Sequence, residues 1–476
     1  MSTKFKQGFG FFVVLAVSSF IYFLFSQTPR TDAIPAFARK YQTACSTCHS
    51  NYPELNDFGE AFKKNGFKFP KDDETFVKEA PVLLGAKAQK EAFPKAVYPG
   101  EIPGSIPIGL RYSGFANFNS KRPIGVGFVP RADLFAPNTF TMIAAGSFGP
   151  NISFWIDDDI STGGSGADGG LGDGYIKFND LGHSLGLPKD ALNVRFGQFE
   201  LDLPFSQART INLSDYDIFD QASNIGSLPG TTMNPFVLGA PQRGIEIGGY
   251  PNDGNFAWSA TLVNGNNDGT ALRNSKDVYL RVSQRFNLDR DRASRKEIRA
   301  SGPTGPHDHT SLRLGAFYYY GRNALNLDQT MFPGFGTITE PFYRAGADFR
   351  FKYQKFELYG LAMHGYDKNL FPNLLTNTLD PATPVTFSGG FAEAEYWFYP
   401  WVIGTMRYDV VNSPTDFQNG ASEHNTRNRF SPGMQFLIRD NIKAAFEYQY
   451  QWRQPDPTTN LFFRANGLTA GIDYVF

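Results

Sequence analysis

The chain has little cysteine, no surplus of charge of one sign and no repeat. Its 476 residues include only two cysteines, too few for the disulfide framework of a small secreted scaffold. The formal net charge of −1 offers no basic excess for a phosphate backbone, so we expect no nucleic-acid partner. The negative mean hydropathy predicts no membrane-spanning helix in residues 108–476. No internal repeat occurs at the period of a propeller blade.

The two cysteines belong to one motif, Cys45-Ser46-Thr47-Cys48-His49. At this spacing both thiols can reach the vinyl groups of one porphyrin while the next side chain offers an imidazole to the iron. We therefore predict one covalent haem c, attached to Cys45 and Cys48, with His49 as an axial ligand. A redox disulfide usually accompanies a βαβ pattern, which is absent here. A zinc site would need further ligands nearby, and a chance match is the remaining alternative.

Residues 1–33 have the composition of an export signal. Two early lysines supply a positive start, an apolar run follows up to Phe25, and a short polar stretch ends in Ala33. A peptidase cut there would leave a mature chain that begins at Ile34. The alternative is a retained membrane anchor, because the apolar run is long for a signal. Both interpretations place the rest of the chain outside the cytoplasm.

Residues 34–98 are the predicted monohaem cytochrome domain. Leu55, Phe58 and Phe62 lie at helical spacing, and an Asn-Gly pair soon afterwards is typical of a helix end. We expect this helix to lay its apolar face on the porphyrin. A domain this small has little core of its own, so the haem or a larger partner must supply one.

After a Pro- and Gly-rich linker at 99–107, residues 108–476 predict an all-β transmembrane barrel. Short segments alternate between apolar and polar residues and are rich in aromatics, as expected of a porin-like outer-membrane barrel. A soluble β-sandwich or propeller is the alternative. About sixteen antiparallel strands are expected, near 108–118, 139–148, 152–159, 172–180, 191–200, 241–250, 255–265, 275–287, 311–322, 341–352, 356–366, 385–398, 402–411, 426–438, 442–452 and 463–476.

The connections between these strands alternate in length. Short turns belong on the periplasmic side of such a barrel and long loops outside. An even number of strands then places both barrel ends, and the cytochrome domain, on the periplasmic side. The longest outer loop is expected at 201–240. The basic segment 288–310 is a long connection on the periplasmic side; it could dock an acidic cytochrome, although a solvated turn is the commoner explanation.

The sixth ligand of the iron has no local source of the usual kind. Between residues 34 and 108 there is no methionine, and His49 is the only histidine, although Met or His is the common choice. Met363 falls on the lumen phase of its strand and is one candidate. Lysine, asparagine, the α-amine or an open site are alternatives. Predicted turns carry three further candidates: His183, His307 and His309. The lipid phase carries the other strand methionines: Met142, Met406 and Met434.

Charged residues in the strands share a phase with Gly and Ser, as a wet lumen requires; examples are Arg407 with Asp409 and Arg427 with Arg429. Acidic groups near the outer face could attract a metal cation, because hard oxygen ligands suit Fe(II). Solvated acids are the ordinary explanation. The acids in question are Asp157 and Asp159 at a strand end and Asp215, Asp217 and Asp220 in the longest outer loop.

The run from Ile34 to Phe69 resembles the N-terminal segment of the fused monohaem cytochrome c–porin family, the outer-membrane cytochromes associated with iron-oxidising bacteria. The order of signal, haem motif, linker and barrel is also similar. The resemblance implies a haem domain inserted into the barrel, which passes electrons from extracellular Fe(II) to a periplasmic cytochrome. The shared features are Ala38-Arg39, the haem motif, Pro53, Leu55, Phe58-Gly59, Phe62-Lys63 and Asn65-Gly66-Phe67.

Two functions follow from these observations. The first is an electron conduit across the bacterial outer membrane. A hydrocarbon core of about 30 Å is too thick for direct tunnelling, so a single haem can serve both sides only from within the span. The second is a substrate or ion porin with a redox-sensitive haem plug or accessory domain. A small-molecule haem enzyme is a distant third, because no acid–base set lies near Cys45.

Overall fold

The computed structural model describes much of the chain with gaps between the described parts. The export signal predicted at 1–33, His307 and His309, and most of the basic segment 288–310 lie outside the described residues. The described residues are 36–69, 73–78, 82–83, 91–95, 101–104, 107–119, 132–149, 151–162, 170–223, 231–232, 236–252, 254–265, 274–288, 310–327, 330, 333–334, 337–368, 370–373, 378–381, 384–413, 416–418, 421–423, 426–453 and 466–476.

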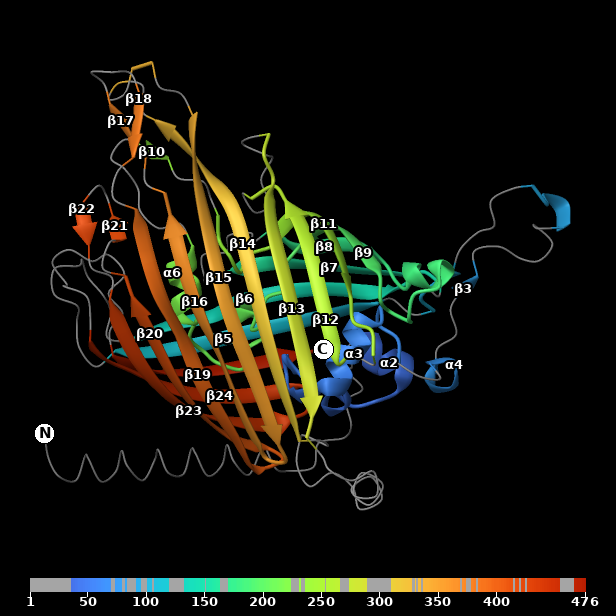
Figure 1. Ribbon diagram of the computed structural model, residues 1–476. Coiled ribbons are helices and arrows are strands. Elements are labelled where there is room, and N and C mark those ends of the chain that lie inside the picture. The colour runs from blue at the N-terminus through green and yellow to red at the C-terminus, as the bar shows by residue number, and fades with distance from the viewer. Residues whose placement is uncertain are drawn as a thin grey trace, which may run out of the picture.

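A closed antiparallel barrel of sixteen strands dominates the structure (Figure 1). Pairing of the last strand with the first closes the ring. The strands are β5 (Ile108–Asn119), β6 (Ala132–Ser147), β7 (Ile152–Thr162), β8 (Gly170–Phe178), β9 (Asn193–Phe199), β11 (Gln242–Gly249), β12 (Phe256–Val263), β13 (Asp277–Asn287), β14 (Ser311–Leu327), β15 (Thr337–Tyr353), β16 (Phe356–Asp367), β19 (Val385–Tyr399), β20 (Val402–Asn412), β23 (Arg427–Arg439), β24 (Ile442–Arg453) and β25 (Gly467–Val475). The predicted sixteen strands are confirmed, although β6 begins at Ala132 rather than near 139.

Apolar side chains face outward from the barrel wall. Along β13, Val278, Leu280 and Val282 are exposed, whereas Tyr279 and Arg281 between them are buried. Met142, Met406 and Met434 are also exposed, as their predicted lipid phase requires. An apolar exterior over a polar interior is the reverse of a soluble sandwich, and it identifies a membrane-spanning barrel.

The two ends of the barrel differ in the length of their connections. Turns such as 353–356 and 439–442 join strands at one end, where β5 begins and β25 ends. At the other end the connections carry two small hairpins: β17 (Leu370–Asn373) with β18 (Thr378–Pro381), and β21 (Asp416–Gln418) with β22 (Ala421–Glu423). Among the described residues, no helix has the length and apolarity needed to cross a membrane.

Two segments from distant parts of the sequence lie inside the barrel. Residues 36–69 occupy the lumen at the short-turn end, which also holds the chain's C-terminus (Figure 1). Residues 201–222, which include α6 (Asp217–Ala222), pack against the inner face of β19 and β20. The prediction that this part of loop 201–240 lies outside is wrong. It turns inward because Asp217 finds cationic partners on the lumen wall.

A few short elements lie outside the barrel wall. Between the 36–69 segment and the first barrel strand, β3 (Val82–Leu83) pairs with β4 (Glu101–Ile102), and α4 spans Asp73–Phe76. The predicted linker at 99–107 therefore contributes one strand of this pair. Two further short elements are η2 (Leu181–Leu185) and β10 (Thr231–Thr232), which pairs with β14, whereas η3 (Gln207–Arg209) belongs to the 201–222 segment in the lumen.

Candidate functional site

The cysteine motif forms a compact turn that is tied to the helix after it. The segment consists of α2 (Ala36–Tyr41), η1 (Cys45–Thr47), β1 (His49–Asn51), β2 (Glu54–Leu55) and α3 (Asp57–Lys64). Asn56 caps α3, because its side-chain oxygen accepts a hydrogen bond from the Gly59 amide at 2.9 Å. The Asn56 side-chain amide also donates to the Thr47 carbonyl at 3.1 Å. One residue thus fixes both the helix start and the turn that carries the cysteines.

Helix α3 approaches the motif closely at Gly59. A Cβ atom built there would lie 2.0 Å from the carbonyl oxygen of Cys48, so only glycine fits. The predicted helix end at Asn65 is confirmed, with Asn65 as the C-cap and Gly66 at a φ of 70°. Phe62 is buried and Leu55 faces the same cavity, as expected, but Phe58 packs edge-on against Phe69 instead.

A cavity of about 410 Å³ lies between this segment and the barrel wall, and Cys45, Cys48 and His49 all line it. Its walls are mainly apolar, with a few polar groups, which is typical of cofactor sites of this size. Phe67 of the segment meets Trp155 of β7 with ring centroids 5.6 Å apart, so both sides build the wall. Apolar lining residues include Phe37, Leu55, Phe62, Phe67, Ile143 and Trp155.

Burial shifts the ionisation of both thiols of the cysteine motif. Burial raises the pKa of Cys45 to about 11 and that of Cys48 to about 12. Both thiols therefore stay protonated at neutral pH, unlike the cysteines of reactive disulfide centres. No group of three or more His, Cys, Asp or Glu side chains in the described parts of the chain could hold a metal ion, so the zinc alternative gains no support.

His49 is held in the orientation and charge state that a metal ligand needs. Its Nδ1 atom lies 3.2 Å from the backbone carbonyl oxygen of Glu54. In the tautomer in which Nδ1 donates this hydrogen bond, Nε2 keeps its lone pair for the iron. Burial lowers the pKa of His49 to about 4, so the imidazole is neutral at neutral pH.

Polar contacts fasten the segment to the lumen wall, and the sequence patterns did not reveal them. On one side, Asn51 donates to Gln435 at 2.6 Å and Lys443 donates to the Tyr52 carbonyl at 2.8 Å. Elsewhere the contacts are Arg350 to Glu54 at 3.0 Å, Lys352 to Asp57 at 2.9 Å and Lys177 to the Lys64 carbonyl at 2.8 Å. Burial would raise the pKa of Asp57, but Lys352 and Arg285 outweigh it and lower that pKa.

Met363 does not share the cavity with the cysteine motif. It is 3% exposed and belongs to a second apolar cluster, which it forms with residues of the 201–222 segment such as Ile218 and Phe219. His183 is exposed in the turn between β8 and β9. Among the described residues that line the cavity there is no methionine and no second histidine. The sixth-ligand prediction for Met363 therefore receives no support from proximity.

The proposed outer cluster of acids is not present as expected. Asp217 is fully buried and lies 3.1 Å from Arg429, so it cannot serve an external cation. Asp215 and Asp220 are exposed. Asp157 and Asp159 line the cavity beside the cysteine motif rather than a separate surface site. Asp157 accepts hydrogen bonds from the Trp155 indole at 2.9 Å and the Asp173 amide at 2.7 Å.

Among known proteins, the chain is similar to solved structures only. No protein-family model matches the chain, and neither does any curated protein. The outer-membrane channel DcaP of Acinetobacter baumannii is 13% identical, over 78% of this chain and 96% of that one, with a TM-score of 0.48. The anion-selective porin from Comamonas acidovorans is 11% identical, over 78% and 98%, with a TM-score of 0.49.

OmpT of Vibrio cholerae is 8% identical, over 78% of this chain and 98% of that one, with a TM-score of 0.47. These likenesses are too distant to carry an argument about function. The class of the protein rests instead on its own strand pairing and outward apolar face: it is a sixteen-stranded transmembrane barrel with two of its own segments in the lumen.

Proposed function

We propose that this protein is an outer-membrane c-type cytochrome that conducts electrons through its barrel. The observation that carries the proposal is the placement of Cys45, Cys48 and His49 around one apolar cavity inside the lumen. A haem there would lie within the membrane-spanning wall rather than beside it. That position shortens the distance that each electron must cross, compared with the full hydrocarbon core of about 30 Å.

The residues present fit a covalently bound haem. Cys45 and Cys48 would form the two thioether bonds, and His49, oriented by the Glu54 carbonyl, would ligate the iron. When bound, the haem supplies a centre that takes up and releases one electron. Phe62 and Phe67 exclude water from the site, and Gly59 lets α3 close over it.

The sixth ligand is proposed to be neither methionine nor a second histidine. The cavity as described offers other polar groups: Tyr175 and Asp157. One of these, or an open position, would complete the iron coordination. In this interpretation the reduced protein binds carbon monoxide more readily than a cytochrome with a firm methionine ligand does.

The proposed donor and acceptor lie at opposite ends of the barrel. We infer that the short-turn end, where residues 36–69 sit, faces the periplasm. An extracellular donor, Fe(II), would lose one electron and become Fe(III), and a periplasmic cytochrome would take up that electron at the short-turn end. Cys45, Cys48 and His49 would hold a one-electron centre between these two partners.

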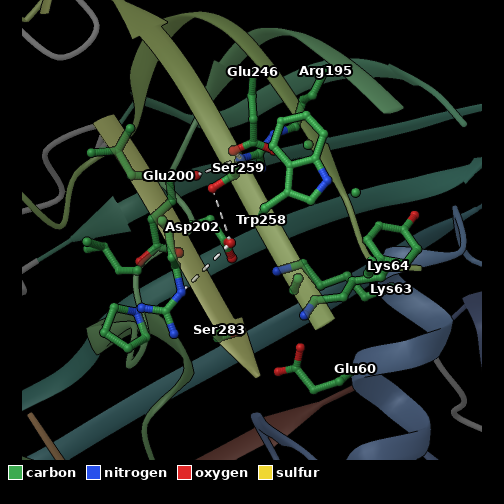
Figure 2. A pocket seen from close by; sticks show the side chains of 18 of the residues that line it. Glu60, Lys63, Lys64, Arg195, Glu200, Asp202, Glu246, Trp258, Ser259 and Ser283 are labelled. Atoms are coloured by element: carbon green, nitrogen blue, oxygen red, sulfur yellow. Dashed lines mark hydrogen bonds and ion pairs between the residues drawn. The ribbon is translucent and has the colours of Figure 1, made fainter. Parts of the chain in front are cut away.

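A substrate or ion porin is the second candidate. It is favoured by a charged cavity of about 160 Å³ that runs beside α3 and could hold water and ions (Figure 2). Single-channel conductance in planar bilayers separates the two functions. A conduit whose lumen is filled by its own segments conducts few ions, whereas an open porin conducts many.

The decisive experiment is stopped-flow reduction in proteoliposomes with the long-loop face outward. Fe(II) is added outside, an oxidant is trapped inside, and the haem absorbance is followed. Prompt haem reduction followed by reduction of the trapped oxidant supports the conduit and its donor. Reduction by dithionite but not by Fe(II) discards iron as the donor. No reduction by any impermeant external reductant contradicts the conduit and favours the porin.

A further inference from the structure

The charged cavity beside α3 contains more cations than anions. It lies between the lumen segment and the wall formed by β8, β9 and β11 to β15, and it has a volume of about 160 Å³. Figure 2 shows Lys63 and Lys64 extending from α3 toward it, with Glu60 of the same helix beside them. Eight cationic and six anionic side chains line it. The cations are Lys63, Lys64, Lys177, Arg195, Arg209, Arg281, Arg313 and Arg350, and the anions are Asp57, Glu60, Glu200, Asp202, Glu246 and Asp348.

Most of the acids in this cavity already have a partner. Arg281 binds Asp348 at 2.8 Å and lies 3.9 Å from Asp202. The other pairs are Arg195 with Glu246 at 2.6 Å, Arg209 with Glu200 at 3.1 Å and Lys352 with Asp57 at 2.9 Å. Each of these carboxylates already lies against a cation, whereas Glu60 takes part in none of these pairs.

Three cations face the cavity without a close partner: Lys63, Lys64 and Arg313. Within the described parts of the chain, none of their side chains forms an ion pair or a hydrogen bond. Burial lowers the pKa of Lys63 to about 8, with Arg209 adding to the effect. Burial also lowers the pKa of Lys64, and Arg313 lowers it further. Arg209 thus disfavours the charged form of Lys63, and Arg313 disfavours that of Lys64; an anion bound in the cavity would relieve both effects.

We propose that Lys63, Lys64 and Arg313 form a binding site for a small anion with charged oxygens. Charge-assisted hydrogen bonds from an ammonium or guanidinium group to such oxygens are short and strong. The anion has two sources. One is a free inorganic oxyanion, which the water-accessible cavity would admit. The other is a carboxylate of the bound haem, because Lys63 and Arg209 line both this cavity and the cavity of the cysteine motif.

The first arm of the test uses inorganic phosphate as the probe. Phosphate binding to the purified full-length protein is measured by titration calorimetry at constant ionic strength. If the site takes free oxyanions, the protein binds phosphate, and Lys64→Gln or Arg313→Gln weakens binding about tenfold or more. Lys189→Gln is the control, because it removes the same charge at an exposed turn outside the cavity. Equal binding by all variants overturns a free-oxyanion site.

The second arm measures the midpoint potential of the haem in phosphate-free buffer, and it alone rests on the proposed function. If the haem carboxylates occupy the site, phosphate does not bind, and Lys64→Gln and Arg313→Gln lower the potential relative to Lys189→Gln. Loss of a nearby positive charge favours the oxidised haem, which gives that sign. No variant-sensitive phosphate binding together with an unchanged potential overturns the proposal. A protein that lacks haem absorbance contradicts the proposed function and leaves the first arm intact.

Discussion

The two segments inside the barrel are held by different physics. Residues 36–69 surround an apolar cavity with an aromatic cluster and touch the wall through polar contacts at their edge. The later part of the second segment, residues 211–222, packs closely against the wall: Ile218 and Ala222 are fully buried, and ion pairs lie beneath them. A segment that fills its space serves as a structural plug. A segment that encloses a cavity is built for something to occupy that cavity.

The ion pairs under the second segment show how firmly it is anchored. Arg407 binds Asp409 at 2.7 Å and Arg429 binds Asp217 at 3.1 Å, with all four side chains buried. Ser214 donates a hydrogen bond to Glu447 on the wall. The lumen-phase charges predicted from sequence thus exist, but their role is to clamp the protein's own chain rather than to line open water.

The largest expected effect comes from emptying the first segment's cavity. Cys45→Ala combined with Cys48→Ala removes both attachment points, and we expect a complete loss of covalently bound haem. The absorbance spectrum of the denatured protein and haem staining after electrophoresis measure this. The barrel itself should still form, because its sixteen strands pair without this motif. Retention of covalent haem by the double variant would contradict the assignment.

The second segment should respond to loss of one buried charge. Asp217→Asn removes one carboxylate from Arg427 and Arg429, although Arg429 keeps Asp409 at 3.4 Å, and breaking a buried pair costs about 3–5 kcal/mol. We expect a looser segment and a higher ion conductance in planar bilayers. Asp220→Asn is the matched control, because Asp220 is exposed on the same helix. Equal conductance of the two variants would show that Asp217 does not hold the plug.

A smaller effect is expected at the contact between α3 and the cysteine turn. In Gly59→Ala the added Cβ would meet the Cys48 carbonyl oxygen at 2.0 Å, so the helix must move away. Overpacking of this kind costs about 1–3 kcal/mol, although Ala is otherwise the better helix residue. Urea unfolding followed by haem absorbance should show the loss. A gain in stability would mean that the turn around Cys48 moves to admit the methyl group at no cost.

The barrel was predictable because a membrane strand must alternate. Met406 and Arg407 are adjacent in sequence and face opposite sides of β20, as the alternation predicts. The helix after the cysteine motif, with its end at Asn65, was predictable for a similar reason, since its pattern is local, and the haem itself stays a prediction. The inward turn of residues 201–222 was not predictable, because it depends on Asp217 meeting Arg429, far away in the sequence. The anchoring of Asn51 by Gln435 has the same origin.

A pH effect is expected at the charged cavity that separates the first segment from the wall. The pKa of Lys63 falls from 10.5 to about 8 on folding, because of burial and then Arg209. Between these two values the unfolded chain binds more protons than the folded chain, so the free energy of unfolding rises with pH across this window. Below pH 8 Lys63 is protonated in both states, and this increase in the free energy of unfolding is absent. The free energy of unfolding, measured by urea at several pH values, should rise more steeply with pH in the wild type than in Lys63→Met over this range. An equal pH dependence in the two proteins would contradict the assignment.

The smallest effect is expected at Met363, where the two segments can be told apart directly. Met363 packs with the second segment in a cluster that includes Phe387 and Phe391, not with the cysteine turn. Replacement by leucine nearly conserves volume and costs less than about 1.5 kcal/mol. We therefore expect Met363→Leu to leave the haem spectrum and midpoint potential unchanged. If methionine were the sixth ligand, losing its sulfur would change both, because axial ligands tune the iron strongly. A changed spectrum would mean that Met363 ligates the iron, and hence that residues around both segments share one haem site.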